Sequence, residues 1–208
     1  MRSFVLLCLT VIFSTLGSQS IAKTSVLVFG DSLSAAYNLQ PDKGWVLLLE
    51  NKLNSAGQNV EFINASISGE TTSGGLVRFS SQVDKTNPDI VILELGANDG
   101  LRGSNLKTMR SNLQSMIKIC QQSNISIILA GMHIPPNYGR TYTHKFDQIY
   151  IALSKMDDVT FIPFFLQGVA TKQDLIQLDG MHPNEKAQPI IASLVEGFLI
   201  PLLKNKAE

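Results

Sequence analysis

Short apolar runs alternate with longer amphipathic stretches along most of this chain. Runs without polar alternation are typical of strands that are buried on both faces. Five of them occur, at residues 25–29, 60–65, 90–95, 126–130 and 160–163. Buried strands separated by stretches of helical length indicate a parallel sheet with helical crossovers. The pattern therefore predicts an α/β fold with five parallel strands.

The stretches between the strands carry apolar side chains at helical spacing. One helical face is formed by Trp45, Leu48, Leu49 and Leu53, and a second by Leu106, Met109, Leu113, Met116, Ile117 and Cys120. We expect these faces to belong to the core and not to a cofactor site. A last helix is predicted over residues 189–203, because proline suits the first turn of a helix. Helices on both faces of the sheet give a three-layer α/β/α, doubly wound and flavodoxin-like fold.

The first residues differ from this pattern. Arg2 is followed by an uncharged run at residues 4–16 and then by small and polar residues ending at Ala22. This is typical of a secretory signal peptide over residues 1–22, with cleavage after Ala22. An uncleaved membrane anchor is the alternative, but the run is shorter than the roughly 20 residues that a spanning helix needs. We therefore expect one domain over residues 23–208, in the periplasm or secreted, monomeric and without stable membrane insertion.

Charge and cysteine content exclude some classes of protein. The chain has 17 Lys and Arg and 17 Asp and Glu residues, so it is formally neutral and nothing favours nucleic acid as a partner. Cys8 lies in the predicted signal peptide, which leaves Cys120 as the one cysteine of the exported chain. No internal disulfide is then possible, and Cys120 is predicted to be a buried apolar residue.

Four short polar segments stand out by their position, each just after a predicted strand or just before the last helix. They lie at residues 30–34, 68–71, 96–100 and 179–183. Open α/β sheets bind ligands at the carboxyl ends of their strands. In strand order 2-1-3-4-5 the switch point, where the strand order reverses, lies between the first and third strands, so Ser32 and Asn98 would face each other across it. The sequence thus predicts a site at this edge.

Ser32, His182 and Asp179 are the residues of this edge that suggest nucleophilic catalysis. A serine hydroxyl is a weak nucleophile until a base takes its proton, and an imidazole is suited to that task near neutral pH. Asp179 would orient His182, because Gly180 permits a tight turn between them. An ordinary Asp-Gly turn beside a helix cap is the alternative for this segment.

Gly69 and Asn98 suggest an oxyanion hole. A tetrahedral intermediate needs hydrogen-bond donors aimed at its developing negative charge. The Gly69 backbone, the Asn98 side-chain amide and the Ser32 backbone N–H would supply them. Taken separately, Gly69 and Asn98 are also ordinary turn residues.

The four segments together resemble those of the SGNH, or GDSL, hydrolase family. Ser32, Gly69, Asn98 and His182 match its four named residues in order. The strings GDSLSAAY, NASISGETT, ELGANDGLRG and DGMHPNEKAQP are similar to those of its bacterial periplasmic thioesterase and lysophospholipase members. The resemblance covers essentially all of residues 23–208. It departs at Ala36, where relatives often have glycine, and at Leu178, where they often have aspartate.

The resemblance implies a three-layer fold with Ser32 as nucleophile, His182 as base, Asp179 as its orienting acid and no metal or cofactor. It also implies fatty acyl esters, lysophospholipids and acyl thioesters as substrates. Apolar residues after the motif segments could line an acyl groove or could equally be packing. The groove candidates are Leu76, Leu101, Ile134, Pro135 and Tyr138, with Val77, Phe79 and Pro136 beside them.

Several alternatives stay open at this point. A carbohydrate O-deacetylase would use the same triad, and a non-catalytic flavodoxin-like binding protein would share only the fold. His133 and His144 lie near the predicted site, but their spacing is not that of metal ligands. Asp31 and Asp99 adjoin the candidate site residues and are expected to be turn or hydrogen-bonding residues.

Overall fold

The five predicted strands lie in one parallel sheet in a computed structural model that describes residues 23–207. The predicted signal peptide at residues 1–22 lies outside this described part. The strands are β1 (Thr24–Gly30), β2 (Val60–Asn64), β3 (Ile90–Glu94), β4 (Ser126–Ala130) and β5 (Val159–Ile162). Their order is β2-β1-β3-β4-β5. The predicted number, direction and order of the strands are confirmed, and their ends differ from the prediction by one residue at most.

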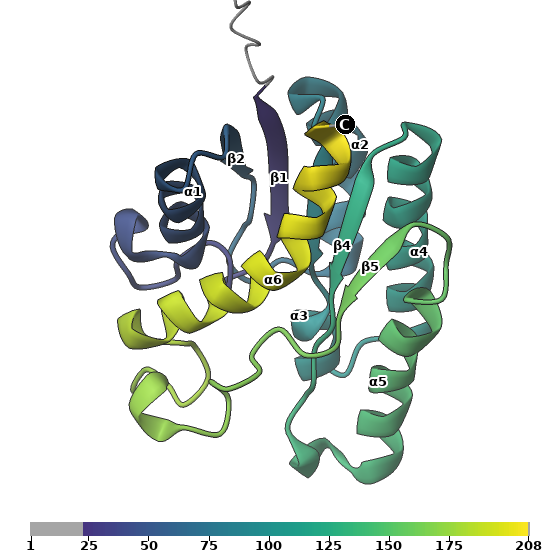
Figure 1. Ribbon diagram of the computed structural model, residues 1–208. Coiled ribbons are helices and arrows are strands. Elements are labelled where there is room, and N and C mark those ends of the chain that lie inside the picture. Colours follow the sequence, from purple (N-terminus) through teal and green to yellow (C-terminus); the bar gives the residue numbers. More distant parts are fainter. Residues whose placement is uncertain (1–22, 208) are drawn as a thin grey trace, which may run out of the picture.

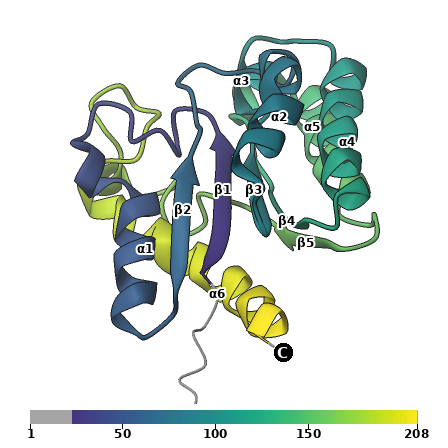
Figure 2. The same cartoon turned by 90° about the horizontal axis from the view of Figure 1, so that it is seen from above.

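Helices cover both faces of the sheet, as Figures 1 and 2 show. They are α1 (Trp45–Ser55), α2 (Thr72–Thr86), α3 (Ala97–Leu101), α4 (Leu106–Gln122), α5 (Arg140–Leu153) and α6 (Gln188–Ala207). On one face α1 packs against α6, and on the other α2 packs against α4 and α4 against α5. The predicted three-layer α/β/α architecture is thus confirmed.

The predicted helical faces point into the core. Trp45, Leu49 and Leu53 of α1 are buried, whereas Leu48 is half-buried at the margin. The face of α4 is buried from Met109 to Cys120, and Cys120 itself is 1% exposed. The interpretation of this cysteine as a small buried apolar residue is therefore confirmed.

The last helix, α6, extends beyond its predicted range at both ends. Residues 185–204 are long and apolar enough to cross a membrane by length and composition. However, Ile191, Val195, Leu199 and Leu203 are buried, and the helix packs against α1, β4 and β5. Pro201 does not end the helix, because residues on either side of it are held by the core. These contacts identify α6 as a core helix of the α/β/α fold.

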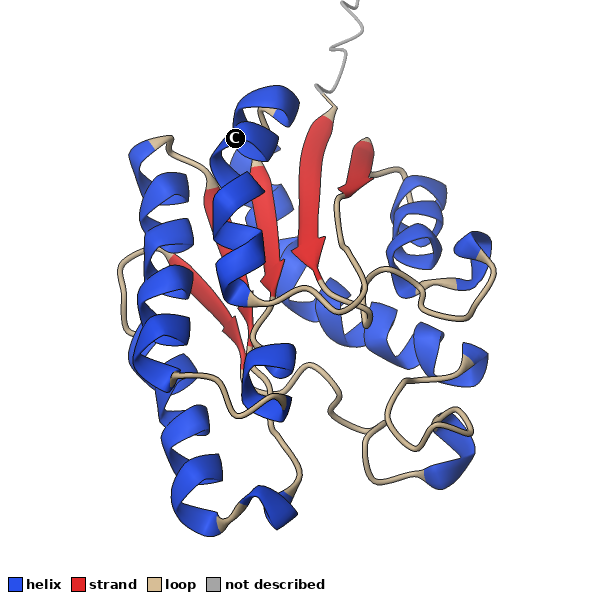
Figure 3. Cartoon of the chain, turned by 180° about the vertical axis from the view of Figure 1, so that it is seen from behind, coloured by secondary structure: helices blue, strands red, loops and turns tan. Residues whose placement is uncertain are grey.

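The strands all point toward the edge where the loops that follow them lie (Figure 3). The register of β1 with β3 sets Gly30 opposite Glu94, so the turns after these two central strands start side by side. All five residues of β3 are buried, as are the last five of β1. The edge predicted to carry the site is therefore anchored in the most deeply buried part of the sheet.

Candidate active site

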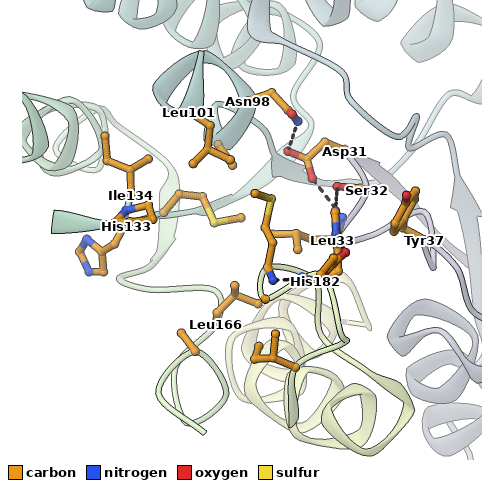
Figure 4. A pocket seen from close by; sticks show the side chains of 18 of the residues that line it. Asp31, Ser32, Leu33, Tyr37, Asn98, Leu101, His133, Ile134, Leu166 and His182 are labelled. Atoms are coloured by element: carbon orange, nitrogen blue, oxygen red, sulfur yellow. Dashed lines mark hydrogen bonds and ion pairs between the residues drawn. The ribbon is translucent and has the colours of Figure 1, made fainter. Parts of the chain in front are cut away.

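Ser32, His182 and Asp179 form a continuous hydrogen-bonded chain at this edge. Ser32 lies in the turn after β1, and its Oγ is 2.9 Å from His182 Nε2, a contact drawn in Figure 4. His182 Nδ1 is 2.6 Å from Asp179 Oδ2 on the other side of the ring. If Nδ1 carries the proton that bonds Asp179, Nε2 is free to accept the proton of the Ser32 hydroxyl. The structure thus brings together three residues that span 150 positions in the sequence.

The loop that carries Asp179 and His182 is fixed by its own backbone. Asp179 Oδ1 accepts hydrogen bonds from the N–H groups of Met181 and His182, at 2.9 and 3.0 Å. Gly180 adopts φ +72°, the left-handed conformation that glycine reaches without strain. An antiparallel bridge between Ile176 and Pro183 closes the loop. The tight turn that the sequence predicted between the acid and the imidazole is therefore present.

The hydrogen bonds on Asp179 also favour its ionised form. Desolvation raises the pKa of this carboxyl, but the two backbone N–H groups and the His182 ring outweigh that effect and lower the pKa to about 2. A group whose folded pKa is lowered stabilises the fold above its unfolded pKa and loses that contribution only as pH falls. At neutral pH the residue facing His182 is accordingly a carboxylate.

Three predicted hydrogen-bond donors lie at the pocket that Ser32 lines. The backbone N–H groups of Ser32 and Gly69 have no acceptor among the described residues. Gly69 adopts φ +79°, and Arg102 Nη2 donates to its carbonyl at 2.9 Å, which fixes the orientation of this loop. Asn98, in the first turn of α3, uses one amide hydrogen on Asp31 Oδ2 at 3.0 Å and has a second one left. All three predicted donors border the same pocket.

Asp31 and Glu94 form a buried carboxyl pair beneath the turn that carries Ser32. Asp31 accepts hydrogen bonds from the Leu33 N–H at 3.0 Å and from Asn98, so the interpretation of Asp31 as a turn and hydrogen-bonding residue is confirmed. Glu94 Oε2 accepts from Ser34 Oγ at 2.7 Å and from the Asp31 N–H at 3.4 Å. One network therefore joins the end of β3 to the turn after β1.

Both carboxyl groups hold their proton more tightly than usual. Burial raises the pKa of Asp31 to about 6, against the lowering effect of the Leu33 N–H, the His182 charge and the Asn98 amide. Burial, and then the negative charge of Asp31, raise the pKa of Glu94 well above its ordinary value. Glu94 is therefore a carboxyl group that keeps its proton to higher pH than an ordinary glutamate. Its Oε1 is buried with no hydrogen-bond partner among the described residues, which a carboxylate would tolerate poorly.

Asp99, like Asp31, joins two segments of the site by hydrogen bonds. Its two carboxylate oxygens accept from the backbone N–H and the hydroxyl of Thr72, at 2.8 and 2.7 Å. This contact ties the start of α2 to α3, so Asp99 is a hydrogen-bonding residue as the sequence predicted. The helix that presents Asn98 is thereby held against the helix that follows Gly69.

An apolar pocket of about 710 Å³ opens beside Ser32. This volume lies in the range of small-molecule sites, which are typically apolar with a few placed polar groups. Figure 4 shows Leu101 and Ile134 across the pocket from Ser32 and His182. The apolar residues of the wall are Leu33, Ala97, Leu101, Met132, Ile134, Pro135, Pro136, Phe164, Leu166, Ala170, Ile176 and Met181.

The structure places the groove candidates in different surroundings. Leu101, Ile134 and Pro135 line the pocket, but Leu76 and Tyr138 are not on its wall. Leu76 packs against the core, because α2 turns it toward the sheet. Tyr138 is exposed, and its hydroxyl donates to the carbonyl of Leu101.

Two further candidates fall outside the pocket wall. Phe79 is fully buried, with its ring centroid 4.8 Å from that of Phe29, so it belongs to the core. Val77 is exposed on the outer face of α2. Helical periodicity thus places the residues of α2 away from the pocket.

Other wall residues were missed by the sequence reasoning. Met132 and Phe164 lie two residues after the ends of β4 and β5, so the rule that sites lie at the carboxyl ends of parallel strands could have identified them. Leu166 and Ala170 lie in the irregular segment after β5, where no periodicity marks them. Tyr37, whose ring packs at a tilt against the His182 ring with centroids 4.3 Å apart, had no sequence signal either.

The two remaining histidines have other surroundings. His133 lies on the pocket wall, with its Nδ1 2.8 Å from Asp147 Oδ1 and its ring against Phe164. His144 lies on the surface of α5. Within residues 23–207, no group of three or more His, Cys, Asp or Glu side chains is arranged to hold a metal ion.

A hydroxyl bonded to an imidazole that is backed by a carboxylate can act as a nucleophile. Unpaired N–H groups beside it can stabilise negative charge on an attacked carbonyl oxygen. An apolar pocket adjoining both can hold an aliphatic chain. The arrangement is thus suited to acyl transfer from an ester or thioester to water.

The buried carboxyl pair gives a prediction for Glu94. Because its pKa is higher in the folded than in the unfolded chain, its contribution to stability is complete below about pH 4.5 and is lost as pH rises toward its folded pKa. We expect Glu94→Gln to make the free energy of unfolding less dependent on pH above about 4.5. Glu94→Leu should cost about 1–3 kcal/mol, since it leaves Ser34 and the Asp31 N–H without an acceptor.

Urea unfolding at several pH values would measure both effects. Glu61→Gln is the matched control, because this glutamate is exposed in β2 and pairs only with Lys23. It should change stability by less than about 0.5 kcal/mol. A Glu94→Gln variant with the pH dependence of the parent would show that Glu94 is ionised in the folded protein.

Comparison with known proteins agrees with this geometry. A model of the GDSL-like Lipase/Acylhydrolase family matches residues 28–189. An arylesterase from Vibrio mimicus is 44% identical over 190 residues, covering 91% of this chain and 95% of that protein. The thioesterase 1/protease 1/lysophospholipase L1 of Escherichia coli (strain K12) is 37% identical over 187 residues, covering 90% and 88%.

A solved structure agrees as well. The psychrotrophic esterase EstA from Pseudoalteromonas sp., in a structure inhibited by monoethylphosphonate, has a TM-score of 0.83 and 41% identity, covering 87% of this chain and 99% of that one. The matched region contains every segment of the candidate site. The chain therefore belongs to the GDSL, or SGNH, lipase/acylhydrolase family and is an ester or thioester hydrolase.

Proposed function

We propose that the protein is an exported serine esterase that hydrolyses acyl esters and thioesters through an acyl-enzyme on Ser32. The observation that carries this proposal is the hydrogen-bonded chain from Ser32 through His182 to Asp179 at the mouth of an apolar pocket. We further propose that it acts as a monomer on small acyl substrates, without nucleic acid as a partner and without a cofactor.

In the first half of the reaction, Ser32 Oγ attacks the acyl carbonyl carbon while His182 Nε2 accepts the hydroxyl proton. The tetrahedral intermediate collapses, and the alcohol or thiol leaves with the proton from His182. In the second half, water attacks the acyl-enzyme with His182 again as base, and the acid is released. Asp179 stays ionised throughout and stabilises the imidazolium, which is consistent with its lowered pKa.

The negative oxygen of the intermediate would be bound by the Ser32 and Gly69 N–H groups and the Asn98 amide. Two observations support these roles. Both backbone N–H groups lack an acceptor among the described residues. The Asn98 amide is held in place by the hydrogen bond that it donates to Asp31 Oδ2. Donors that are already in position do not have to reorient when negative charge develops on the carbonyl oxygen. This preorganisation is the main source of transition-state stabilisation in an oxyanion hole.

The pocket supports aliphatic acyl chains as the preferred group. Its wall is formed mainly by aliphatic, methionine and proline side chains, and polar side chains, the candidate residues among them, form the smaller part of it. Relatives named arylesterase and thioesterase 1/protease 1/lysophospholipase L1 favour aryl esters, acyl thioesters and lysophospholipids as the substrate classes. A mainly apolar wall offers few hydrogen-bond partners for the hydroxyl groups of a sugar, which weighs against a carbohydrate O-deacetylase.

Hydrolysis of p-nitrophenyl esters from acetyl to palmitoyl tests the proposal. We expect the rate to rise from acetyl toward medium chains, since each added CH₂ buries further apolar surface. Ser32→Ala should lose the activity at every length, whereas Ser111→Ala on the surface of α4 should keep it. Activity confined to acetyl esters would indicate the deacetylase, and none at all would indicate a binding protein of this fold.

Asn98→Ala tests the oxyanion site separately. We expect kcat to fall about 10²- to 10³-fold, because one donor to the developing charge is lost. KM should change little, since the donor matters most in the transition state. Asn112→Ala is the control, because its amide bonds Thr72 and Ser73 away from the pocket. Unchanged turnover of the Asn98 variant would remove this side chain from the mechanism.

Export is proposed on the sequence of residues 1–22 alone. Expression of the full chain in a Gram-negative host should give a protein that begins at Lys23 in the periplasmic fraction. N-terminal sequencing and intact mass would measure this. A chain that keeps Met1 and remains in the membrane fraction would instead support the uncleaved anchor.

A further inference from the structure

Large apolar side chains are exposed around the mouth of the pocket. Seven such side chains are exposed among the described residues, and five of them lie in loops at the carboxyl edge of the sheet. Leu178 is the extreme case, because it is as exposed as in an extended peptide, at 109%. We call four of these the apolar rim, which consists of Tyr37, Ile67, Leu178 and Met181.

The apolar rim is continuous with the pocket. Tyr37 and Met181 are both exposed and part of the pocket wall. Ile67 directly precedes Ser68 and Gly69, which also line the pocket. Leu178 adjoins Asp179 in the closed loop between Ile176 and Pro183. Anything that covers the rim is therefore in contact with the entrance through which an acyl chain reaches Ser32.

The loops of the apolar rim are held in place relative to one another. Gln177 Nε2 donates to the carbonyl of Tyr37 at 3.0 Å, and Asn38 Nδ2 donates to Gln177 Oε1 at 3.2 Å. The Ile67 N–H donates to the carbonyl of Gly30 at 3.1 Å. These bonds fix the loops that carry Tyr37, Ile67 and Leu178. Leu178 is thus exposed in a loop whose backbone is held in one conformation.

The surroundings of the apolar rim favour a lipid surface as its occupant. A protein partner seated on the rim would close the entrance to Ser32, whereas a lipid aggregate offers apolar surface and also contains substrate. Two charged side chains close to the rim are engaged within the protein, Asp179 with His182 and Arg102 with the Gly69 carbonyl. They carry opposite charges, so this part of the surface fits a neutral or zwitterionic lipid better than an anionic one.

We propose that the apolar rim rests on the surface of a zwitterionic lipid aggregate, from which an acyl ester passes directly into the pocket. The proposal rests on the proposed function and adds where the substrate is taken up. The contact is shallow and reversible, because a few apolar side chains give only modest affinity for a membrane surface.

The test uses vesicles of phosphatidylcholine that contain lysophosphatidylcholine, with flotation as the measure of binding. Leu178→Asp and Ile67→Asp should each weaken binding about tenfold, since each removes an apolar side chain from the contact and adds a charge. Ile151→Asp is the matched control, because Ile151 is exposed near the end of α5, away from the loops of the rim. It should bind as the parent does.

Two hydrolysis rates, one for a substrate in vesicles and one for a dissolved substrate, distinguish a failure of this inference from a failure of the proposed function. Hydrolysis of the lysophosphatidylcholine in the vesicles should fall with binding in both rim variants. Hydrolysis of p-nitrophenyl acetate, which is dissolved as a monomer, should stay at the parent rate, because neither residue lines the pocket. A parent that fails to hydrolyse p-nitrophenyl acetate would contradict the proposed function itself.

Two results would overturn the inference. One is vesicle binding and vesicle hydrolysis by Leu178→Asp and Ile67→Asp at the level of the parent. The other is a dimer of the parent that forms without lipid, as measured by sedimentation, and that is lost in Leu178→Asp. That second result would identify another copy of this chain as the occupant of the apolar rim.

Discussion

The pairing of β1 with β3 is the constraint on which the site depends. Their register sets Gly30 opposite Glu94, and a Cβ atom at position 30 would lie 2.6 Å from Glu94 Oε2. Only glycine therefore lets the Glu94 carboxyl approach the turn and bind Ser34 and the Asp31 N–H. Asp31 in turn holds Asn98. A backbone pairing in the buried centre of the sheet thus fixes the candidate nucleophile and a candidate oxyanion donor together.

Much of this arrangement could be predicted because it follows from chain periodicity and topology. Buried apolar runs indicated the five strands, and the switch point of a doubly wound sheet placed Ser32 and Asn98 on the same edge. The network beneath them could not be predicted in the same way. Glu94 is a single acid inside an apolar run, and only the register of β1 with β3 reveals that its partners are Ser34 and Asp31.

The pocket wall was the least predictable part, for a physical reason. Apolar side chains carry no sign of whether they face a cavity or the core, so Leu76 and Leu101 look alike in the sequence. The orientation of α2 turns Leu76 toward the core, and the short helix α3 places Leu101 on the pocket wall. Ala36 is a different case, since its φ of +54° is a conformation that favours glycine, the residue that the family resemblance led us to expect there. A non-glycine residue in this conformation costs about 1 kcal/mol, which the surrounding turn must offset.

The closed loop between Ile176 and Pro183 has a consequence for how such an enzyme can change. It contains both Asp179 and His182, together with the backbone N–H groups that hold the carboxylate. The proposed acid and base are therefore a local unit of the chain, whereas the proposed nucleophile lies 150 positions from His182, in the turn after β1. An insertion before Ile176 or after Pro183 could change the entrance of the pocket and leave the contact between Asp179 and His182 as it is. Access to the pocket and the geometry of the Asp179–His182 pair can in this way change independently.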